Sequence, residues 1–331
     1  MRYGPGKTPT PAETRRIRPV NPRLYRLGDL EPLAEWIDSV REEAAGVFTQ
    51  PTLVLFCGDH GIAEQDVSAY SAGDCAQRLR SIIAGSEAVS RLAEPRGVRI
   101  MPVDVSLDHS VDPLGATSSA AFAPSAAINT ADALTAAQVT QAMELGAKVA
   151  DTNIEAGTDL FLLGDLGRGS TAVAATVISI IIDVEPLKCV GRGSGIEDEA
   201  WMRKMSAVRD ARRRAVPHRR DSHELLRICG GADFAAAVGF LLRACERRIP
   251  VILDGVVGAA VALLTHQLNP EAHRSWQVAR NSDEPAQKIA INALGLRPIL
   301  ELTLPFGEGI GALLALAVLQ GAATLAEADR N

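Results

Sequence analysis

The chain has 331 residues, of which 47% are hydrophobic, and its formal net charge is −6 at pH 7. This length and composition allow a large buried core, and the acidic balance argues against nucleic acid as the main partner. The five cysteines show no CxxC spacing and predict neither a zinc site nor a disulfide framework. The N-terminal sequence lacks the apolar core of a signal peptide, and the apolar stretch 309–325 suits a buried helix better than a membrane span. We therefore expect a cytoplasmic protein.

Short apolar runs recur along the chain, and each is followed by an acid or a glycine. They lie at 52–57, 98–103, 159–163 and 250–253. Runs of this kind are typical of strands that are buried on both faces of a parallel sheet. Between them lie Ala- and Leu-rich stretches with helical spacing, at 74–94, 135–156, 171–183, 233–247 and 256–266. This alternation predicts an α/β fold, Rossmann-like and doubly wound, with a mainly parallel sheet.

Acids follow the predicted strands at the edge where doubly wound folds bind ligands. These acids are Asp59, Asp104, Asp165 and Asp254. Aspartate is also a good helix N-cap, so capping is an alternative role for each of them. Four acids at four strand ends nevertheless indicate that this edge is the place to look for a site.

The two ends of the chain read differently from its centre. Residues 21–46 and 285–331 are mainly helical in pattern, and we expect them to form a small helical domain beside a large α/β domain at 47–284. Residues 1–20 are expected to be a flexible arm. The basic run 211–220 is interpreted as a solvated loop, and 107–130 as a long loop rich in Ser, Ala and Pro.

Two glycine-rich turns are candidate anion sites. The turn at 164–171 follows a predicted strand and opens a helix, where backbone N–H groups and the helix dipole suit a phosphate. The turn at 191–198 precedes a helix from which Lys204 could reach back to a phosphate. Neither turn matches a nucleotide-binding fingerprint, so phosphate binding and a purely structural turn both stay open.

Glu308 is a lone carboxylate between two glycines in the block LPFGEGIG at 304–311. A carboxylate held there can take a proton from a bound substrate. The alternative is a loop that begins a helix, with Glu308 near the positive end of the helix dipole. A carboxylate and a phosphate site at one edge would suit transfer of a phosphorylated sugar to a nitrogen base.

At these blocks the chain resembles the nicotinate-nucleotide–dimethylbenzimidazole phosphoribosyltransferase family. The matching blocks include GDHGIAEQDVSAY at 58–70, LLGDLGRGST at 162–171, GRGSG at 191–195, ILDGVVGAA at 252–260, SDEP at 282–285 and LPFGEGIGALLA at 304–315. The resemblance implies a homodimer that moves ribose 5-phosphate from nicotinate mononucleotide to 5,6-dimethylbenzimidazole or a related aromatic base. The reaction releases nicotinate and belongs to assembly of the cobalamin nucleotide loop. No cofactor is expected, and no metal, because the six histidines show no paired ligand spacing.

The resemblance also implies roles for individual residues. Glu308 takes the position of the proposed general base, and Asp165 that of a second catalytic carboxylate, one methylene shorter than the family's glutamate. The implied nucleotide- or phosphate-binding residues are Gly167, Gly169, Gly193, Lys204, Gly255, Ser282 and Gly307. The implied base-binding residues are Ser68, Tyr70, Gln77 and Phe306.

Several residues around these blocks depart from the family's usual pattern. They are Arg168, Arg280, Gln287, Phe306 and Ile310. Two alternatives therefore stand beside the main hypothesis. One is a divergent homologue with a different acceptor base or donor, and the other is a catalytically silent nucleotide-binding subunit.

Overall fold

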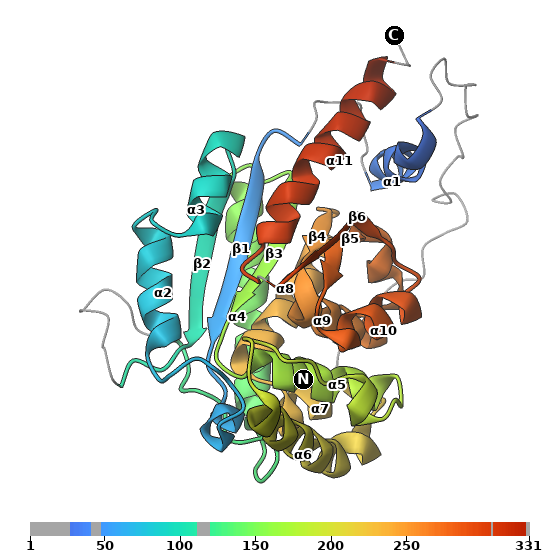
Figure 1. The fold of residues 1–331 in the computed structure, drawn as a ribbon. Helices are drawn as coiled ribbons and strands as arrows, with labels where there is room; N and C mark the ends of the chain where they lie inside the picture. The colour runs from blue at the N-terminus through green and yellow to red at the C-terminus, as the bar shows by residue number, and fades with distance from the viewer. Residues whose placement is uncertain (1–26, 41–47, 111–119, 306, 329–331) are drawn as a thin grey trace.

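In the described part of the chain, six parallel strands form one sheet at the centre of the protein (Figure 1). The computed structural model describes residues 27–40, 48–110, 120–305 and 307–328. The strands are β1 (Pro51–Gly58), β2 (Arg99–Ser106), β3 (Leu160–Leu166), β4 (Val251–Leu253), β5 (Trp276–Ser282) and β6 (Pro298–Leu304). The strand order is β2-β1-β3-β4-β5-β6, so the direction of winding reverses between β1 and β3. The predicted doubly wound α/β fold is confirmed.

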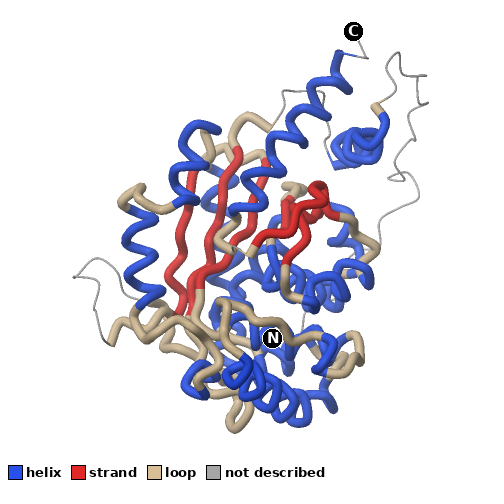
Figure 2. Tube along the Cα trace, viewed as in Figure 1, coloured by secondary structure: helices blue, strands red, loops and turns tan. Residues whose placement is uncertain are grey.

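Helices cover both faces of the sheet (Figure 2). The helices are α1 (Glu31–Val40), α2 (Asp74–Ile83), α3 (Ala88–Ala93), α4 (Ala136–Glu155), α5 (Ser170–Ile181), α6 (Asp198–Ala215), α7 (Ser222–Cys229), α8 (Ala232–Glu246), α9 (Gly255–Leu268), α10 (Pro285–Ala293) and α11 (Ile310–Ala328). Successive side chains of a strand point to opposite faces. In β1, Val54 and Phe56 join the core under α4, α8 and α9, whereas Leu53 and Leu55 join the core under α3 and α11.

The C-terminal segment, predicted as mainly helical, contains the helices α10 and α11 but also a strand that the prediction did not include. Residues 298–304 form β6, which pairs with β5 as the parallel edge strand of the sheet. An edge strand is covered on fewer sides, and the half-exposed sequence PILELTL lacks the continuous apolar run that revealed the central strands. The helix α1 packs against α11, but the division of the chain into two domains stays a prediction. The expected N-terminal arm, 1–20, lies outside the described residues.

Helix α11 is long and apolar enough to cross a membrane, judged by length and composition alone. In the fold it packs against β3, β5 and β6 on one side and against α1 and α3 on others. Its buried side chains include Ala312, Leu313, Leu316 and Leu319, all of them fully enclosed. The apolar sequence therefore serves the core of the α/β fold.

The helices α4 and α8 approach each other so closely that only glycine fits at the contact. A side chain at Gly146 would place its Cβ 1.7 Å from the carbonyl oxygen of Ala236. A side chain at Gly239 would place its Cβ 2.0 Å from the carbonyl oxygen of Met143. Because both obstacles are backbone atoms, the packing of this helix pair depends on the two glycines.

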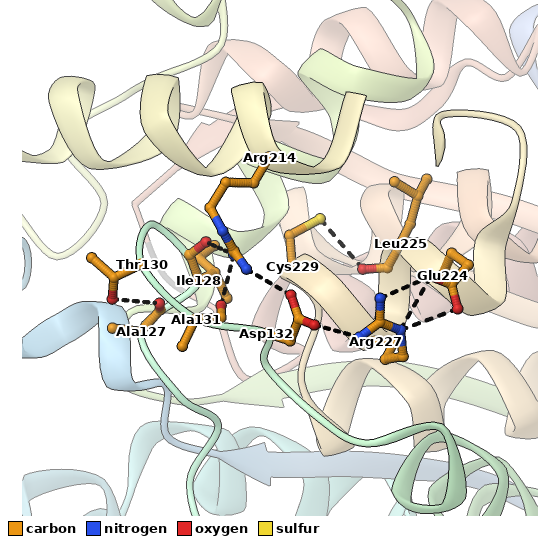
Figure 3. A network of polar contacts seen from close by, with 10 residues as sticks. All are labelled: Ala127, Ile128, Thr130, Ala131, Asp132, Arg214, Glu224, Leu225, Arg227 and Cys229. Atoms are coloured by element: carbon orange, nitrogen blue, oxygen red, sulfur yellow. Dashed lines mark hydrogen bonds and ion pairs between the residues drawn. The ribbon is translucent and has the colours of Figure 1, made fainter. Parts of the chain in front are cut away.

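The basic run 211–220 is not a loop over its first half, where the prediction is wrong. Helix α6 continues to Ala215, because Val208, Ala211 and Ala215 share one buried face. The side chain of Arg214 extends from that helix and donates to the backbone oxygens of Ile128 and Ala131, at 2.6 and 2.7 Å (Figure 3). The run thus begins as a helix whose charged face binds a neighbouring loop.

Asp132 is the centre of that attachment (Figure 3). Its carboxylate pairs with Arg214 on α6 at 2.6 Å and with Arg227 on α7. Arg227 also pairs with Glu224, one turn earlier on its own helix. The network ties the loop before α4 to two helices. Residues 111–119 of the predicted long loop lie outside the described part of the chain.

Candidate active site

A cleft of about 990 Å³ opens beyond the carboxyl ends of β5 and β6. Four segments line it: Tyr70 and Arg78, the turn at 190–195, the first turns of α6, and the residues that follow β5 and β6. It therefore lies at the edge of the sheet where doubly wound folds bind ligands. The lining joins apolar side chains, Trp201 and Met202, to the carboxylates of Glu284 and Glu308.

Glu308 lies in the cleft wall on a strained piece of backbone. Its φ is 63°, in the left-handed region that a non-glycine residue rarely adopts. The backbone N–H of Glu308 donates to the carbonyl oxygen of Asp165 at 3.2 Å, which fixes the turn over the end of β3. The side chain is only 8% exposed. The strained backbone conformation of this turn thus fixes the position of the Glu308 carboxylate in the cleft wall.

The two carboxylate oxygens of Glu308 have different surroundings. Its Oε1 is 2.5 Å from Nε of Arg78 on α2. Its Oε2 is buried and has no hydrogen-bond partner among the described residues. Burial raises the pKa of Glu308, the charge of Arg78 opposes this, and Glu87 adds to it. The result is an anchored carboxylate with one oxygen left to accept a proton.

Asp165 lies beneath this turn, at the end of β3. Burial raises its pKa to about 7, helped by repulsion from Asp254, Asp233 and Glu308 and opposed by Arg280. The predicted second carboxylate therefore lies near Glu308, and its pKa is raised well above that of an ordinary carboxyl group. It is not among the residues that line the cleft, so its catalytic role stays a prediction.

The other acids at the strand ends mainly hold loops in place. Asp59 accepts from the backbone N–H groups of Arg168 and Asp108, at 2.7 and 3.0 Å. Asp254 accepts from the N–H of Gly311 at the start of α11, at 2.8 Å. These contacts match the alternative of capping and turn formation more closely than they match ligand binding.

Lys204 is completely buried below the glycine turn at 191–195. Its Nζ donates to Thr171 Oγ1 at 2.9 Å and to the Gly191 oxygen at 3.1 Å, and lies 3.8 Å from Glu284 Oε2. Burial lowers the pKa of Lys204, and the charge of Glu284 opposes this. The ammonium therefore supports the floor of the cleft from below.

Gly193 makes this arrangement possible. Its φ is 55°, and a Cβ there would lie 2.6 Å from Thr171 Oγ1 and 3.0 Å from Lys204 Nζ. Its N–H donates to Glu284 Oε1 at 2.5 Å. The turn at 191–195 packs directly on Lys204, so a ligand on the other side of the turn would interact with the ammonium charge through one layer of backbone.

The first glycine turn is used differently. A Cβ at Gly167 would lie 2.0 Å from the Gly58 oxygen, and one at Gly169 would lie 3.2 Å from Ile62. The Nε of Arg168 donates to the backbone oxygen of Tyr70 at 3.0 Å, and its guanidinium pairs with the Glu64 carboxylate at 2.5 Å. The turn therefore packs against the loop that follows β1, and a phosphate contact there stays a prediction.

The structure gathers only part of the predicted site in the cleft. Among the predicted residues, its lining includes Tyr70, Gly193, Gly307 and Glu308. Ser68 lies behind the wall, with its Oγ 3.5 Å from that of Ser194. Phe306 lies outside the described residues. The lining does not include Ser68, Gln77, Gly167, Gly169, Lys204, Gly255 or Ser282.

The cleft lining includes several residues that the sequence did not predict as part of the site. Arg78 directly follows the predicted Gln77, but nothing local links it to Glu308. Glu284 lies in the predicted block 282–285, yet only Ser282 was singled out there. Trp201 stands three residues before Lys204, a helical spacing that could have indicated a shared face. Its Nε1 donates to the Val190 oxygen at 3.1 Å.

Comparisons with known proteins point in one direction. A family model described as phosphoribosyltransferase matches residues 10–329. A nicotinate-nucleotide–dimethylbenzimidazole phosphoribosyltransferase of Mycobacterium tuberculosis is 40% identical over 327 residues, covering 97% of this chain and 90% of that protein. One of Streptomyces avermitilis is 42% identical over 320 residues, covering 95% and 85%. The crystal structure of CobT from Thermus thermophilus is 29% identical, with a TM-score of 0.84, covering 91% and 90%.

The match extends across both the sequence and the fold. It includes the strands that build the sheet and the turn that carries Glu308. The chain therefore belongs to the nicotinate-nucleotide–dimethylbenzimidazole phosphoribosyltransferase family.

Proposed function

We propose that this protein transfers ribose 5-phosphate from nicotinate mononucleotide to 5,6-dimethylbenzimidazole in cobalamin biosynthesis. The products are α-ribazole 5′-phosphate and nicotinate. One observation carries the proposal: Glu308 presents an unpartnered, buried carboxylate oxygen in a cleft large enough for a nucleotide and an aromatic base. Family membership supplies the substrate class.

The chemistry needs a base at the acceptor and an anchor for the donor. Glu308 Oε2 accepts the proton of one ring nitrogen while the other nitrogen forms a bond to C1 of the ribose. The bond from C1 to the nicotinate nitrogen breaks, and its electron pair stays on that ring, which becomes neutral. Orienting both substrates in one cleft makes the attack effectively unimolecular.

The turn at 191–195 is the proposed place for the donor phosphate. Lys204 lies beneath it, and burial prevents water from screening that charge. Lys204→Met is expected to raise the KM for nicotinate mononucleotide about tenfold or more while changing kcat less. Lys188→Met, an exposed lysine on a neighbouring turn, serves as the control. An unaltered KM in Lys204→Met would remove Lys204 from phosphate binding.

The test is direct. Purified protein is incubated with nicotinate mononucleotide and 5,6-dimethylbenzimidazole, and α-ribazole 5′-phosphate is measured by mass spectrometry. A panel of other aromatic bases, and nicotinamide mononucleotide as donor, then separates a divergent specificity from the main proposal. If no combination yields product, the proposed transferase activity is refuted and the alternative of a catalytically silent nucleotide-binding subunit is favoured.

Glu308→Gln isolates the proposed base. Turnover is expected to fall about 100- to 10,000-fold, with donor affinity little changed. The matched control is Glu301→Gln, an exposed carboxamide substitution on β6. Turnover of Glu308→Gln close to that of the parent would exclude Glu308 as the base.

We also propose a cytoplasmic homodimer, as the family resemblance implies. Support comes from the described residues, in which β6 is the edge strand of the sheet and carries the 43% exposed Leu302. Analytical ultracentrifugation of the purified protein tests the proposal, and a monomer at micromolar concentration would refute it.

A further inference from the structure

Arg78 lies between two carboxylates at the wall of the cleft. Its Nε is 2.5 Å from Glu308 Oε1 and 3.9 Å from Glu87 Oε2. A second nitrogen of the same guanidinium donates to the Tyr70 hydroxyl at 3.4 Å. One cation thus faces a buried acid on one side and a more exposed acid on the other, with side-chain exposures of 8% for Glu308 and 28% for Glu87.

The guanidinium cannot satisfy both acids equally at one time. The short contact is to Glu308, and the long contact to Glu87 is near the limit of an ion pair. The charge of Arg78 favours ionised Glu308, and the charge of Glu87 favours protonated Glu308. Loss of the charge on Glu308 would therefore leave Glu87 as the stronger attraction for Arg78.

The groups around Glu308 leave these two as its main charged neighbours. Arg78 comes from α2, Glu87 from the turn before α3, and Tyr70 from the loop before α2. Burial raises the pKa of Tyr70, so its hydroxyl is neutral at physiological pH. Asp165 approaches from β3, where its backbone oxygen accepts from the Glu308 backbone N–H, and its carboxyl group also interacts electrostatically with Glu308.

We propose that Arg78 is a positioning residue that moves between two partners during the reaction. It holds ionised Glu308 with Oε2 toward the acceptor base, and it shifts toward Glu87 when Glu308 takes the proton from the ring nitrogen. Glu87 thus stabilises the protonated state, and Arg78 stabilises the ionised state. Release of the proton to water returns Arg78 to Glu308. This rests on the proposed role of Glu308 as the base.

The test is the acid limb of the pH profile of kcat, where protonation of Glu308 stops the reaction. Arg78→Met is expected to move that limb to higher pH, lowering kcat on the limb about tenfold if the pKa rises by one unit. Glu87→Gln is expected to move the limb to lower pH. Arg78→Lys keeps the charge and should stay close to the parent. Arg91→Met, an exposed arginine on α3, is the control for removal of a nearby charge.

A purely structural role for Arg78 and Glu87 would lower activity without opposite shifts of the limb. Shifts in the same direction, or no shift, would overturn the proposal. Carbon-13 NMR of the Glu308 carboxyl follows the same titration without turnover. If Glu308→Gln is fully active, the proposed base has failed. The NMR shifts then still decide whether Arg78 and Glu87 act on Glu308 in opposite directions.

Arg78 and Glu87 are each about one-third exposed, and Glu87 makes no side-chain cap hydrogen bond to α3. Both substitutions are therefore expected to leave the fold intact, which circular dichroism confirms before the kinetics.

Discussion

Arg280→Met is expected to destabilise the protein through one buried ion pair. Arg280 Nε lies 3.0 Å from Asp254 Oδ1, and each side chain is only 1% exposed. The same guanidinium donates to the Leu304 oxygen at 2.6 Å, at the end of β6. Asp254 holds the N–H of Gly311 at 2.8 Å, at the start of α11. The pair thus fastens both ends of the turn that carries Glu308.

The magnitude follows from what the substitution leaves behind. Methionine fills much of the volume, so the main cost is an isolated buried carboxylate at Asp254. Breaking a buried pair in this way costs about 3–5 kcal/mol. Combining Arg280→Met with Asp254→Asn removes the stranded charge and keeps an oxygen for the Gly311 N–H. The double variant should therefore regain more than half of the loss.

The destabilisation should also depend on pH. Burial raises the pKa of Asp254, and Arg280 is the largest opposing influence. Without Arg280 the pKa rises further, so native Asp254 binds a proton more tightly than the unfolded chain does. Stability is then kept at low pH and lost as pH rises through the folded pKa. The difference between Arg280→Met and the parent should be larger at pH 8.5 than at pH 5.5.

Urea unfolding followed by far-ultraviolet circular dichroism measures these free energies at both pH values. A loss of about 0.5 kcal/mol or less for Arg280→Met would refute this role of the ion pair, because surface substitutions produce changes of that size. Equal instability of the single and double variants would show that the stranded carboxylate is not the cause.

Three further predictions concern packing, charge and loop attachment. Gly146→Ala should lower the free energy of unfolding by about 2 kcal/mol or more, because the new Cβ would force α4 away from Ala236. Gly321→Ala, where a Cβ on α11 meets no described atom within 4 Å, should instead raise it by about 0.4–1 kcal/mol. Thermal unfolding of the two variants compares these effects. Asp165→Asn should stabilise the protein on the order of 1 kcal/mol or more at pH 8 and have little effect at pH 4, because the raised pKa of about 7 means that the parent loses stability as pH rises from the ordinary carboxyl pKa to that value; equal effects at the two pH values would contradict this. Asp132→Asn should accelerate amide hydrogen exchange in the loop before α4. The free energy of global unfolding should fall by only about 1 kcal/mol, because the partners of Asp132 are partly exposed. Unchanged exchange in that loop would show that the ion pairs do not hold it.

The apolar runs of β1 and β3 predicted buried parallel strands correctly. A strand with helices on both faces must be apolar throughout, and that requirement is written in consecutive residues. The same reasoning missed β6, because an edge strand with exposed side chains needs no continuous apolar run. The prediction of a loop at 211–215 was also wrong, because the arginines on one face of α6 outweighed the buried alanines on the other face in the sequence pattern.

Local sequence patterns were enough to predict the alternation of strands and helices and to mark Glu308 as a candidate base between glycines. The surroundings of Glu308, in contrast, follow from the tertiary fold. The left-handed backbone of Glu308, its contact with Arg78, and the support of its turn by Arg280 and Asp254 all join segments that are distant along the chain. Local patterns record which side chains are buried, whereas these contacts arise from the crossover connections that bring the ends of β5 and β6 beside α2 and α11.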